Sequence, residues 1–314
     1  MIDASGVRIR WADLPASVRA GVEGVLGEPV VAAEPQRGGF SPGTADRVRT
    51  AGGRRAFVKA VGAALNERTP TMHRREAVVT AALPPQASAP RLLGVHDDGD
   101  WVALVLTDVE GRHPHTPWEP AELAAVTAAL TGLAQALTPS PLRDATPAAV
   151  RLRHDFEGWQ RLADDPPVDL APWVTVELPW LCAAADRGLA ALAGDTLVHC
   201  DIRADNLLIR PDGTVVVVDW PWGCTGPSWL DTLLLGVNVR VYGGDGEAVL
   251  TGLSSRTGVS PATLTDVLVG FTGFFVDAGR LPAVPGLPTV REFQRAQGEA
   301  LLPWLRRRIS PRGT

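Results

Sequence analysis

The segment HCDIRADNLLIRPDGTVVVVDW, residues 199–220, carries more chemical information than any other stretch of the chain. Asp201 follows His199 by two residues, and Asn206 follows Asp201 by five. A Pro-Asp-Gly turn then separates two apolar runs, and the second of these runs ends in Asp219. This pattern predicts a loop followed by a β-hairpin that brings a second carboxylate back to the loop.

The residue types and their spacing in this segment favour phosphoryl transfer, a reaction that requires positioning and charge neutralisation more than covalent chemistry. We expect Asp201 to orient an acceptor hydroxyl and to accept its proton. Asn206 and Asp219 are expected to bind Mg²⁺, because amide and carboxylate oxygens suit this ion. His199 is interpreted as a buried scaffold of the loop. Arg203 is expected to contact the transferred phosphate, since a guanidinium matches phosphate geometry.

Lys59 is the one lysine among the 30 basic residues of the chain. Where arginine is so strongly favoured, a remaining lysine indicates a position that needs a compact ammonium on a flexible stem. We therefore expect Lys59 to contact the α- and β-phosphates of a nucleotide. Glu76 is the expected carboxylate partner of Lys59, and Glu67 is the alternative.

The first hundred residues are predicted to form antiparallel strands and one helix. Alternation and turn residues predict five strands, over residues 29–36, 45–51, 54–61, 91–95 and 101–107. Helical spacing predicts one helix, over residues 72–83. In the glycine turn after the first strand, the backbone of Gly39 and the hydroxyl of Ser41 are expected to contact phosphates. The backbone of the connector at Thr107 and Val109 is expected to bind the nucleotide base.

The rest of the chain is predicted to be mostly helical, apart from the hairpin of residues 207–220. Helices are expected over residues 119–137, 148–162, 178–192, 228–241, 247–256, 261–279 and 288–308. Asp231 lies in one of the apolar helices, where a buried carboxylate requires a hydrogen-bonding partner, and we expect it to brace the loop backbone.

These elements predict an α+β class and a bilobal protein-kinase-like fold. The N-terminal lobe, residues 1–107, is expected to bind the nucleotide with an antiparallel sheet plus one helix. The C-terminal lobe, residues 108–314, is expected to be mostly helical with a short catalytic hairpin, and to bind the acceptor and carry out catalysis.

Composition excludes several classes of function. The net charge of −5 and the pI near 5.7 give no support to a nucleic-acid partner. The three cysteines form no C-x-x-C pair and favour a reduced, cytoplasmic compartment. The N-terminal residues do not have the pattern of a signal peptide, and the apolar runs are too short to predict a membrane span.

Taken together, the motifs resemble the aminoglycoside phosphotransferase family, bacterial small-molecule kinases with a protein-kinase-like fold. The resemblance rests on GGFSPGTADRV, FVKAV, RREA, LTDVEGR, HCDIRADNLLI, VDW and QGEALLPWL, which extend in the family's order from about residue 36 to 308. It implies that Asp201 is the catalytic base, that Asn206 and Asp219 bind Mg²⁺, and that Lys59 contacts the phosphates of ATP or GTP.

Two positions depart from the family pattern. The family commonly has Gly where this chain has Cys200, and it often has His where this chain has Arg203. Neither change removes the base or a metal ligand. The expected function is therefore an ATP- or GTP-dependent, magnesium-requiring phosphotransferase acting on a hydroxyl of a small molecule.

The acceptor is left open by the sequence: an antibiotic such as an aminoglycoside, which would imply antibiotic resistance, or a metabolite such as an amino alcohol or a sugar. A polycationic acceptor would require carboxylates that converge in the C-terminal lobe. The candidates there are Asp155, Glu157, Asp164, Asp165, Asp245, Glu247 and Asp277.

Two other functions are considered. A nucleotide-binding regulatory pseudokinase module is disfavoured because Lys59, Asp201, Asn206 and Asp219 occur together. A protein kinase is disfavoured because Asp219 begins Asp-Trp-Pro-Trp instead of Asp-Phe-Gly, and no Ala-Pro-Glu segment follows.

Overall fold

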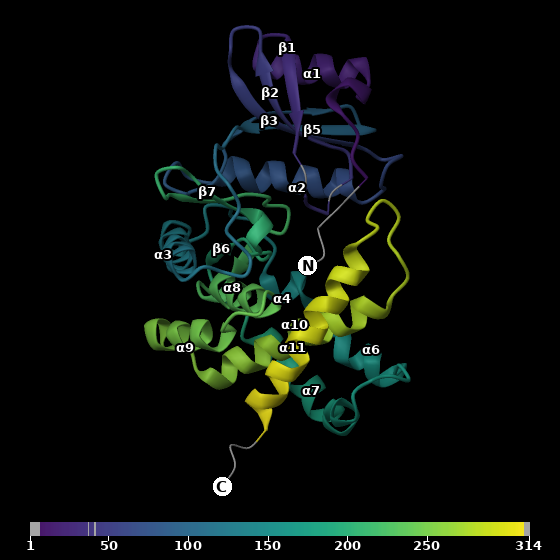
Figure 1. The fold of residues 1–314 in the computed structure, drawn as a ribbon, viewed down its shortest axis with the longest axis vertical. Helices are drawn as coiled ribbons and strands as arrows, with labels where there is room; N and C mark the ends of the chain where they lie inside the picture. The colour runs from purple at the N-terminus through teal and green to yellow at the C-terminus, as the bar shows by residue number, and fades with distance from the viewer. Residues whose placement is uncertain (1–6, 37, 41, 311–314) are drawn as a thin grey trace. The chain divides into compact units, whose positions relative to one another are not determined.

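The computed structural model describes residues 7–36, 38–40 and 42–310. Within these residues the chain forms two compact units, and each is made from several stretches of sequence (Figure 1). Unit 1 comprises residues 1–114, 204–223 and 283–290. Unit 2 comprises residues 115–203, 224–282 and 291–314.

Unit 1 is built on a five-stranded antiparallel sheet with the strand order β1-β2-β3-β5-β4. Its strands are β1 (Val30–Pro35), β2 (Thr44–Thr50), β3 (Arg55–Gly62), β4 (Leu92–Asp97) and β5 (Trp101–Thr107). In the central strand, Lys59 pairs with Ala45 of β2 on one side and with Leu104 of β5 on the other. The five strands expected from alternation are thus all present.

Helices α1 (Ala16–Leu26) and α2 (Thr69–Ala82) cover opposite faces of this sheet (Figure 1). Because successive residues of a strand point to opposite faces, Val105 of β5 packs in the cluster that includes α1, whereas Leu104 packs against Ala77 of α2. The α1 helix is an element that the sequence analysis did not predict, so the expectation of a single helix in this region was wrong.

The hairpin that follows the loop belongs to unit 1. The 3-10 turn η2 (Ala204–Asn206) leads into β7 (Leu207–Ile209), which pairs with β8 (Val215–Val217). Backbone hydrogen bonds join Arg112 to Ile209 in both directions, at 3.0 and 2.7 Å. The sequence predicts two lobes with a single boundary between residues 107 and 108. The two units differ from this division, because these contacts attach the hairpin to the N-terminal sheet unit.

Unit 2 is mostly helical and also holds the short strand pair β6 (Thr196–Val198) and β9 (Cys224–Gly226). Its helices are α3 (Pro120–Ala136), α4 (Ala148–Arg151), α5 (Arg153–Phe156), α6 (Gly158–Asp164), α7 (Pro172–Ala190), α8 (Leu230–Val241), α9 (Gly246–Thr257), α10 (Pro261–Arg280) and α11 (Val290–Ile309). The α10 helix packs against α5, α6 and α7 at the centre of the unit.

The single helix predicted over residues 148–162 is wrong, because this stretch forms α4, α5 and α6. A Cβ atom on Gly158 would lie 2.5 Å from the backbone of Gly273 in α10, so the two backbones are in close contact. The rings of Phe156 and Trp159 likewise lie over Gly270 and Gly273 of α10. Hydrogen bonds of the i→i−4 type continue through both breaks, from Phe156 N to Leu152 O and from Arg161 N to Glu157 O, so the helical path is interrupted only at Leu152 and Glu157.

Within the described residues, α10 is the one helix that is long and apolar enough to cross a membrane. Its most apolar window is 61% buried inside the protein. Val267, Leu268 and Val269 are fully buried. The helix therefore has the burial of a core helix.

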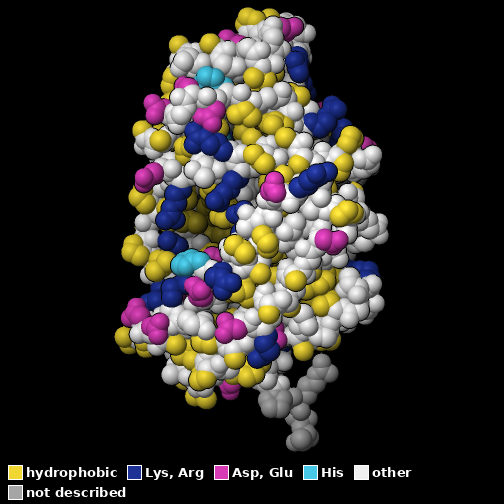
Figure 2. Space-filling view, turned by 180° about the vertical axis from the view of Figure 1, so that it is seen from behind, with side chains coloured by type: hydrophobic (Ala, Val, Ile, Leu, Met, Phe, Trp, Pro, Cys, Tyr) yellow, Lys and Arg dark blue, Asp and Glu magenta, His cyan; other side chains and the backbone are white. Residues whose placement is uncertain are grey.

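The surface carries acidic and basic side chains together. On the face shown in Figure 2, magenta acidic side chains occur among the dark blue basic ones, and several basic side chains gather around a hollow. This face therefore presents a mixed charge.

Candidate active site

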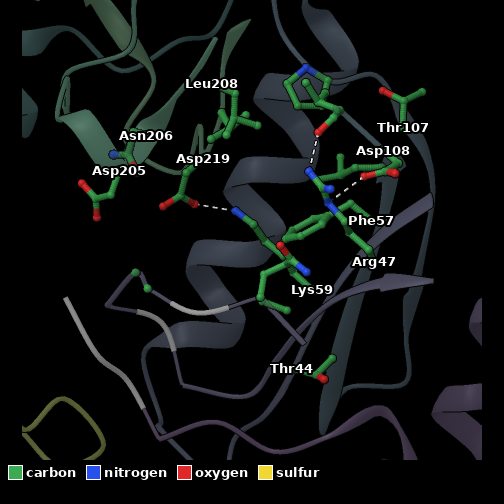
Figure 3. A pocket seen from close by; sticks show the side chains of 18 of the residues that line it. Thr44, Arg47, Phe57, Lys59, Thr107, Asp108, Asp205, Asn206, Leu208 and Asp219 are labelled. Carbon is green, nitrogen blue, oxygen red and sulfur yellow. Dashed lines mark hydrogen bonds and ion pairs between the residues drawn. The ribbon is translucent and has the colours of Figure 1, made fainter. Parts of the chain in front are cut away.

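A pocket in unit 1 collects several of the residues expected to bind a nucleotide (Figure 3). The sheet, α2, the connector after β5 and the hairpin all contribute to its walls. Of the predicted residues, the ones that line it are Gly39, Lys59, Thr107, Val109, Asn206 and Asp219. Residues separated by about 160 positions in the chain are thus brought to one cavity.

At the centre of the pocket, Lys59 contacts two carboxylates. Its Nζ atom lies 2.7 Å from Oε1 of Glu76. The same atom lies 2.5 Å from Oδ1 of Asp219, a contact drawn as a dashed line in Figure 3. Glu76 is 2% exposed, whereas Glu67, the alternative partner, lies on the surface. The structure therefore pairs Lys59 with Glu76.

Strand and helix geometry explain this arrangement. Lys59 points to the face of β3 that α2 covers, and Glu76 lies on the buried side of α2. Asp219 follows β8 with φ of 68°, a left-handed conformation that is uncommon outside glycine. Such a backbone conformation costs free energy, which the surrounding contacts must offset. Conformations of this kind occur more often at functional sites than elsewhere.

The opposite charges of Lys59 and its two carboxylate partners stabilise one another. Burial opposes the charge of Lys59, but the carboxylates of Asp219 and Glu76 outweigh this effect and raise its pKa. Burial raises the pKa of Glu76, and the Lys59 ammonium partly offsets that shift. An ammonium held between two carboxylates is positioned to bind an anion while remaining charged.

The donor set at one end of the pocket fits Mg²⁺. Asn206, Asp205 and Asp219 line this end and offer amide and carboxylate oxygens. Hard oxygen ligands of this kind are those that Mg²⁺ prefers, usually together with substrate phosphates. Asp205, Asn206 and Asp219 are therefore the residues at this end whose oxygens could hold such an ion.

The glycine turn lines the pocket through Gly38 and Gly39, with φ of 95° and 78°. These left-handed conformations explain why glycines occupy the turn. Ser41, which was predicted to contact phosphates, lies outside the described residues.

The connector after β5 is held by arginines. The Arg47 guanidinium donates to the carbonyl of Val109 at 2.7 Å and contacts the carboxylate of Asp108 (Figure 3). The amide of Thr107 donates to the carbonyl of Arg91 at 2.9 Å. The connector backbone thus lines the pocket, and the carbonyl of Val109 already accepts a hydrogen bond from Arg47.

The loop residues Asp201 and Arg203 belong to unit 2. Arg203 Nη1 lies 3.1 and 3.0 Å from the two carboxylate oxygens of Asp201. The guanidinium of Arg203 also stacks on Phe293, with its central carbon 5.6 Å from the ring centroid. The carboxylate of Asp201 is therefore oriented by the neighbouring arginine.

Asp231 of α8 braces this loop, as expected. Its two carboxylate oxygens accept hydrogen bonds from the amides of His199 and Cys200, at 2.8 and 2.9 Å. His199 is fully buried, and its Nδ1 lies 3.2 Å from the amide of Asp201. Cys200 has φ of 65°, a left-handed conformation that is uncommon outside glycine.

Sequence reasoning did not find Arg8 and His73, which also line the pocket. Arg8 lies in the segment before α1, and its Nη2 donates to the carbonyl of Gly38. His73 lies on α2 and is 3% exposed. Burial, together with the nearby Lys59 ammonium, lowers the pKa of His73 to about 3, so its ring is neutral. The spacing of His73 three residues before Glu76, on the same helix face, is the one sequence signal that pointed to it.

Most of the carboxylates proposed for a polycationic acceptor have structural partners in unit 2. Arg161 contacts Asp277 at 2.6 Å, and Arg280 contacts both Asp277 and Asp165. Asp245 caps the N-terminus of α9 by accepting from the amide of Ala248. These side chains therefore contribute to the structure of the unit.

The other carboxylates of this set differ in their contacts and in their exposure to solvent. Glu247 contacts Arg308 at 2.5 Å and accepts from the indole of Trp304 at 2.7 Å. Asp155 is half-buried, and burial raises its pKa to about 6. Glu157 and Asp164 are exposed.

Comparison with known proteins agrees with this geometry. The model of the phosphotransferase enzyme family matches residues 34–258. No curated protein matches the chain.

Several solved structures share the fold. A thermostable mutant of aminoglycoside phosphotransferase APH(4)-Ia, in a ternary complex with AMP-PNP and hygromycin B, superposes with a TM-score of 0.63 at 13% identity, covering 96% of this chain and 100% of that one. Choline kinase LicA from Streptococcus pneumoniae gives 0.60 at 16% identity, covering 91% and 98%. A putative fructosamine-3-kinase from Haemophilus somnus 129PT gives 0.58 at 11% identity, covering 92% and 96%. At these identities the likeness shows the fold alone.

Proposed function

The chain belongs to the phosphotransferase enzyme family and is a small-molecule kinase, and from this premise we propose that it transfers the γ-phosphate of ATP or GTP to an acceptor hydroxyl with the aid of Mg²⁺. The observation that carries the proposal is that Lys59 contacts both Glu76 and Asp219. Lys59 and Asp219 line the pocket of unit 1, and Glu76 is a buried residue of α2. A phosphoryl-transfer site needs such a charged lysine for the nucleotide phosphates and a carboxylate for the metal.

Each side chain has a proposed role. Lys59, oriented by Glu76, contacts the α- and β-phosphates, while Asn206 and Asp219 hold Mg²⁺. When bound, the ion neutralises charge on the phosphates. The turn at Gly39 covers the phosphates. The backbone of the connector binds the base.

Apolar side chains support the placement of a base in the same pocket. Phe57 and Leu106 line it from the five-stranded sheet, and Leu208 and Val218 line it from the hairpin segment. Pockets that bind small ligands combine apolar walls with a few placed polar groups. The walls near the connector fit a planar base in this way.

Asp201 is the proposed base. It accepts the proton of the acceptor hydroxyl as that oxygen attacks the phosphate. The contact of Arg203 with both carboxylate oxygens holds the side chain in one orientation. We propose that this guanidinium also contacts the transferred phosphate.

For the acceptor, we propose a hydroxylated small molecule that carries little positive charge. Support comes from the ion pairs of Asp165, Glu247 and Asp277 with arginines, which leave fewer carboxylates for a polycation. The comparison structures are named for hygromycin B, choline and fructosamine, so the fold accommodates several acceptor types. A role in antibiotic resistance would require an antibiotic among the acceptors.

We propose a cytoplasmic location, because ATP or GTP is supplied there. The three cysteines are free, which agrees with a reduced compartment. A regulatory module that binds nucleotide without turnover is the second candidate, and the contact of Arg203 with Asp201 is the feature that a module without catalysis would not need.

The test is an ADP-release screen of the purified protein with ATP or GTP and Mg²⁺ across amino alcohols, sugars, neutral antibiotics and aminoglycosides. We expect stimulation by a neutral or singly charged alcohol. Asp201→Asn is expected to lower kcat by about 10³-fold or more while leaving the nucleotide Kd within about threefold. Nucleotide binding without stimulation by any alcohol would favour the regulatory module, and an Asp201→Asn enzyme of full activity would refute the mechanism.

A further inference from the structure

Two buried nitrogen donors face the pocket without an acceptor. Among the described residues, neither Nε of Arg8 nor Nε2 of His73 has a hydrogen-bond partner. Both residues line the same pocket as Lys59. A buried polar group without a partner costs about 1–3 kcal/mol, so such groups call for a ligand or another explanation.

The position of Arg8 connects it to the glycine turn. Its Nη2 donates to the carbonyl of Gly38, and a Cβ atom on Gly39 would lie 3.2 Å from the same nitrogen. The chain at Arg8 is held by a parallel β-bridge to Gly43, with the amide of Ile9 donating to the carbonyl of Gly43 at 3.2 Å. The guanidinium is therefore fixed against the turn, and its charge lies within reach of Asp219 and Asp46.

The position of His73 is fixed by α2. It lies one turn before Glu76 on the same side of the helix, with 3% of its surface exposed. Lys59, Asp219 and Arg8 line the same pocket as this ring. A neutral imidazole in this position can donate one N–H into the pocket.

We infer that Arg8 and His73, together with Lys59, form a subsite for the polyphosphate of the nucleotide. This inference rests on the proposed function and adds two binding residues to it. Arg8 lies outside residues 34–258, the part of the chain that the family model matches. The N-terminal segment thus contributes a cation to the site.

The chemistry of the three donors favours a phosphate over other ligands. A planar guanidinium offers parallel donors that match the oxygens of a phosphate, and charge-assisted bonds of this type are strong. The nearby Gly38-Gly39 turn has the left-handed conformations typical of anion-binding backbone concavities. An oxyanion would accept from Arg8 and His73 at once and satisfy both buried donors.

The test compares the binding of ATP, inorganic tripolyphosphate and adenosine by calorimetry. Arg8→Gln and His73→Phe are each expected to weaken binding of ATP and of tripolyphosphate by about tenfold or more, and to change adenosine binding by less than about twofold. His73→Gln keeps a donor near the position of Nε2 and is expected to retain more affinity than His73→Phe. Arg10→Gln, a change at an exposed arginine of the same segment, is the matched control and is expected to bind all three as the unaltered protein does.

The outcomes separate this inference from the proposed function. If ATP and tripolyphosphate bind Arg8→Gln and His73→Phe as tightly as the unaltered protein, the inference is wrong and the proposed function stands. A second outcome is that the unaltered protein binds tripolyphosphate but no nucleotide, and that the two variants no longer bind tripolyphosphate. In that case the subsite exists and the proposed function fails. If the unaltered protein binds neither ATP nor tripolyphosphate, both are wrong.

A second measurement covers variants that fail to fold. In the unaltered protein, ring ¹⁵N resonances of the histidines can be followed by NMR as tripolyphosphate is added. We expect the Nε2 resonance of His73 to shift at saturation, while that of the exposed His154 stays in place. An unchanged His73 resonance at saturating tripolyphosphate would overturn the inference.

Discussion

At the scale of single residues, the pocket depends on one ammonium between two carboxylates. Lys59 is 14% exposed, and its partners Glu76 and Asp219 are 2% and 26% exposed. Glu76 is too deeply buried to contact an acceptor or solvent freely, so its contribution is to hold Lys59. Charge-assisted hydrogen bonds of this kind contribute more than neutral ones.

Replacement of Glu76 by Gln is therefore expected to lower kcat/KM for the nucleotide by about tenfold to a hundredfold, because Lys59 would then be held by Asp219 alone. A coupled assay of ADP formation at varied ATP measures this effect. Glu67→Gln changes an exposed carboxylate and serves as the matched control, with unchanged kinetics expected. Equal kinetics for the two variants would show that the Lys59–Glu76 contact does not assist nucleotide turnover.

Asp155 gives a prediction for pH. Burial raises its pKa to about 6, whereas an unfolded aspartate titrates near 3.9. Between these values the folded protein binds more protons than the unfolded chain, so this carboxyl makes stability fall as pH rises, with the full loss above about pH 6. Asp155→Asn removes the ionisable group and is expected to be about 1–3 kcal/mol more stable than the unaltered protein at pH 7.

Urea unfolding at pH 4 and pH 7 checks this expectation, since the advantage of Asp155→Asn should shrink towards pH 4. Glu157→Gln, at an exposed carboxylate two residues away, is expected to change stability little at either pH. An advantage that is the same at both pH values would contradict the assignment to Asp155.

At the scale of elements, α1 shows how packing stabilises a helix with weak local propensity. It contains two glycines, Gly21 and Gly24, and buries Val18, Val22 and Leu26 in one stripe against the sheet. These apolar residues recur every four positions, which places them on one face. Burial of this stripe offsets the cost of glycine in a helix.

The two glycines of α1 are expected to respond in opposite ways to alanine. A Cβ atom on Gly24 meets nothing within 4 Å, so Gly24→Ala is expected to stabilise the protein by about 0.5–1 kcal/mol. A Cβ atom on Gly21 would lie 2.2 Å from Nδ1 of His96, so Gly21→Ala is expected to destabilise it. Thermal unfolding of both variants tests the pair, and equal shifts would contradict the packing of α1 on β4.

At the scale of the whole molecule, the predicted roles fall on different units. The pocket, Lys59 and Asp219 belong to unit 1, and Asp201 with its brace Asp231 belongs to unit 2. Each unit has a hydrophobic cluster of its own. The residues proposed to bind the nucleotide can therefore be distinguished by location from the residue proposed to accept the proton.

Hydrogen exchange measured by mass spectrometry checks this division. With saturating AMP-PNP and Mg²⁺, we expect exchange to slow by about tenfold or more in residues 44–62 and 204–219, because ligand binding suppresses local opening where the ligand contacts the protein. Helices α7 and α10 in the core of unit 2 are the internal control and should change much less. Protection confined to α7 and α10 would contradict the placement of the nucleotide in unit 1.

Much of the fold could be predicted where the pattern is local. Alternation predicted the five strands of the sheet, and the turn after Arg210 predicted the β7–β8 hairpin. Local patterns failed where tertiary contacts decide. The stretch of residues 148–162 has helical spacing throughout, but it is divided at Leu152 and Glu157 into three short helices, of which α5 and α6 pack against α10. In α7, the expected start near Leu178 was wrong because the helix begins at Pro172 and continues through Pro179.

The residues of the candidate site divide in the same way. Lys59, Glu76, Asn206 and Asp219 were found because composition, helix spacing and loop spacing mark them in the sequence, although their roles remain proposals. Arg8 carries no such mark, and the one sequence signal for His73 is its position three residues before Glu76 on the same helix face. Arg8 lies about 30 residues before the turn that it contacts, and nothing in its neighbours indicates that contact.

By itself, the sequence determined the fold class, and it marked the loop of residues 199–206, Lys59 and the carboxylates that we propose for phosphoryl transfer. These features depend on residue type and on spacing over a few positions, which strand and helix periods convert directly into a face or a turn. Only the tertiary structure decided that Glu76 pairs with Lys59, that the hairpin joins unit 1, and that Arg8 and His73 reach the pocket. Such contacts depend on how distant segments pack, and the packing is set by the whole core and not by the neighbouring residues.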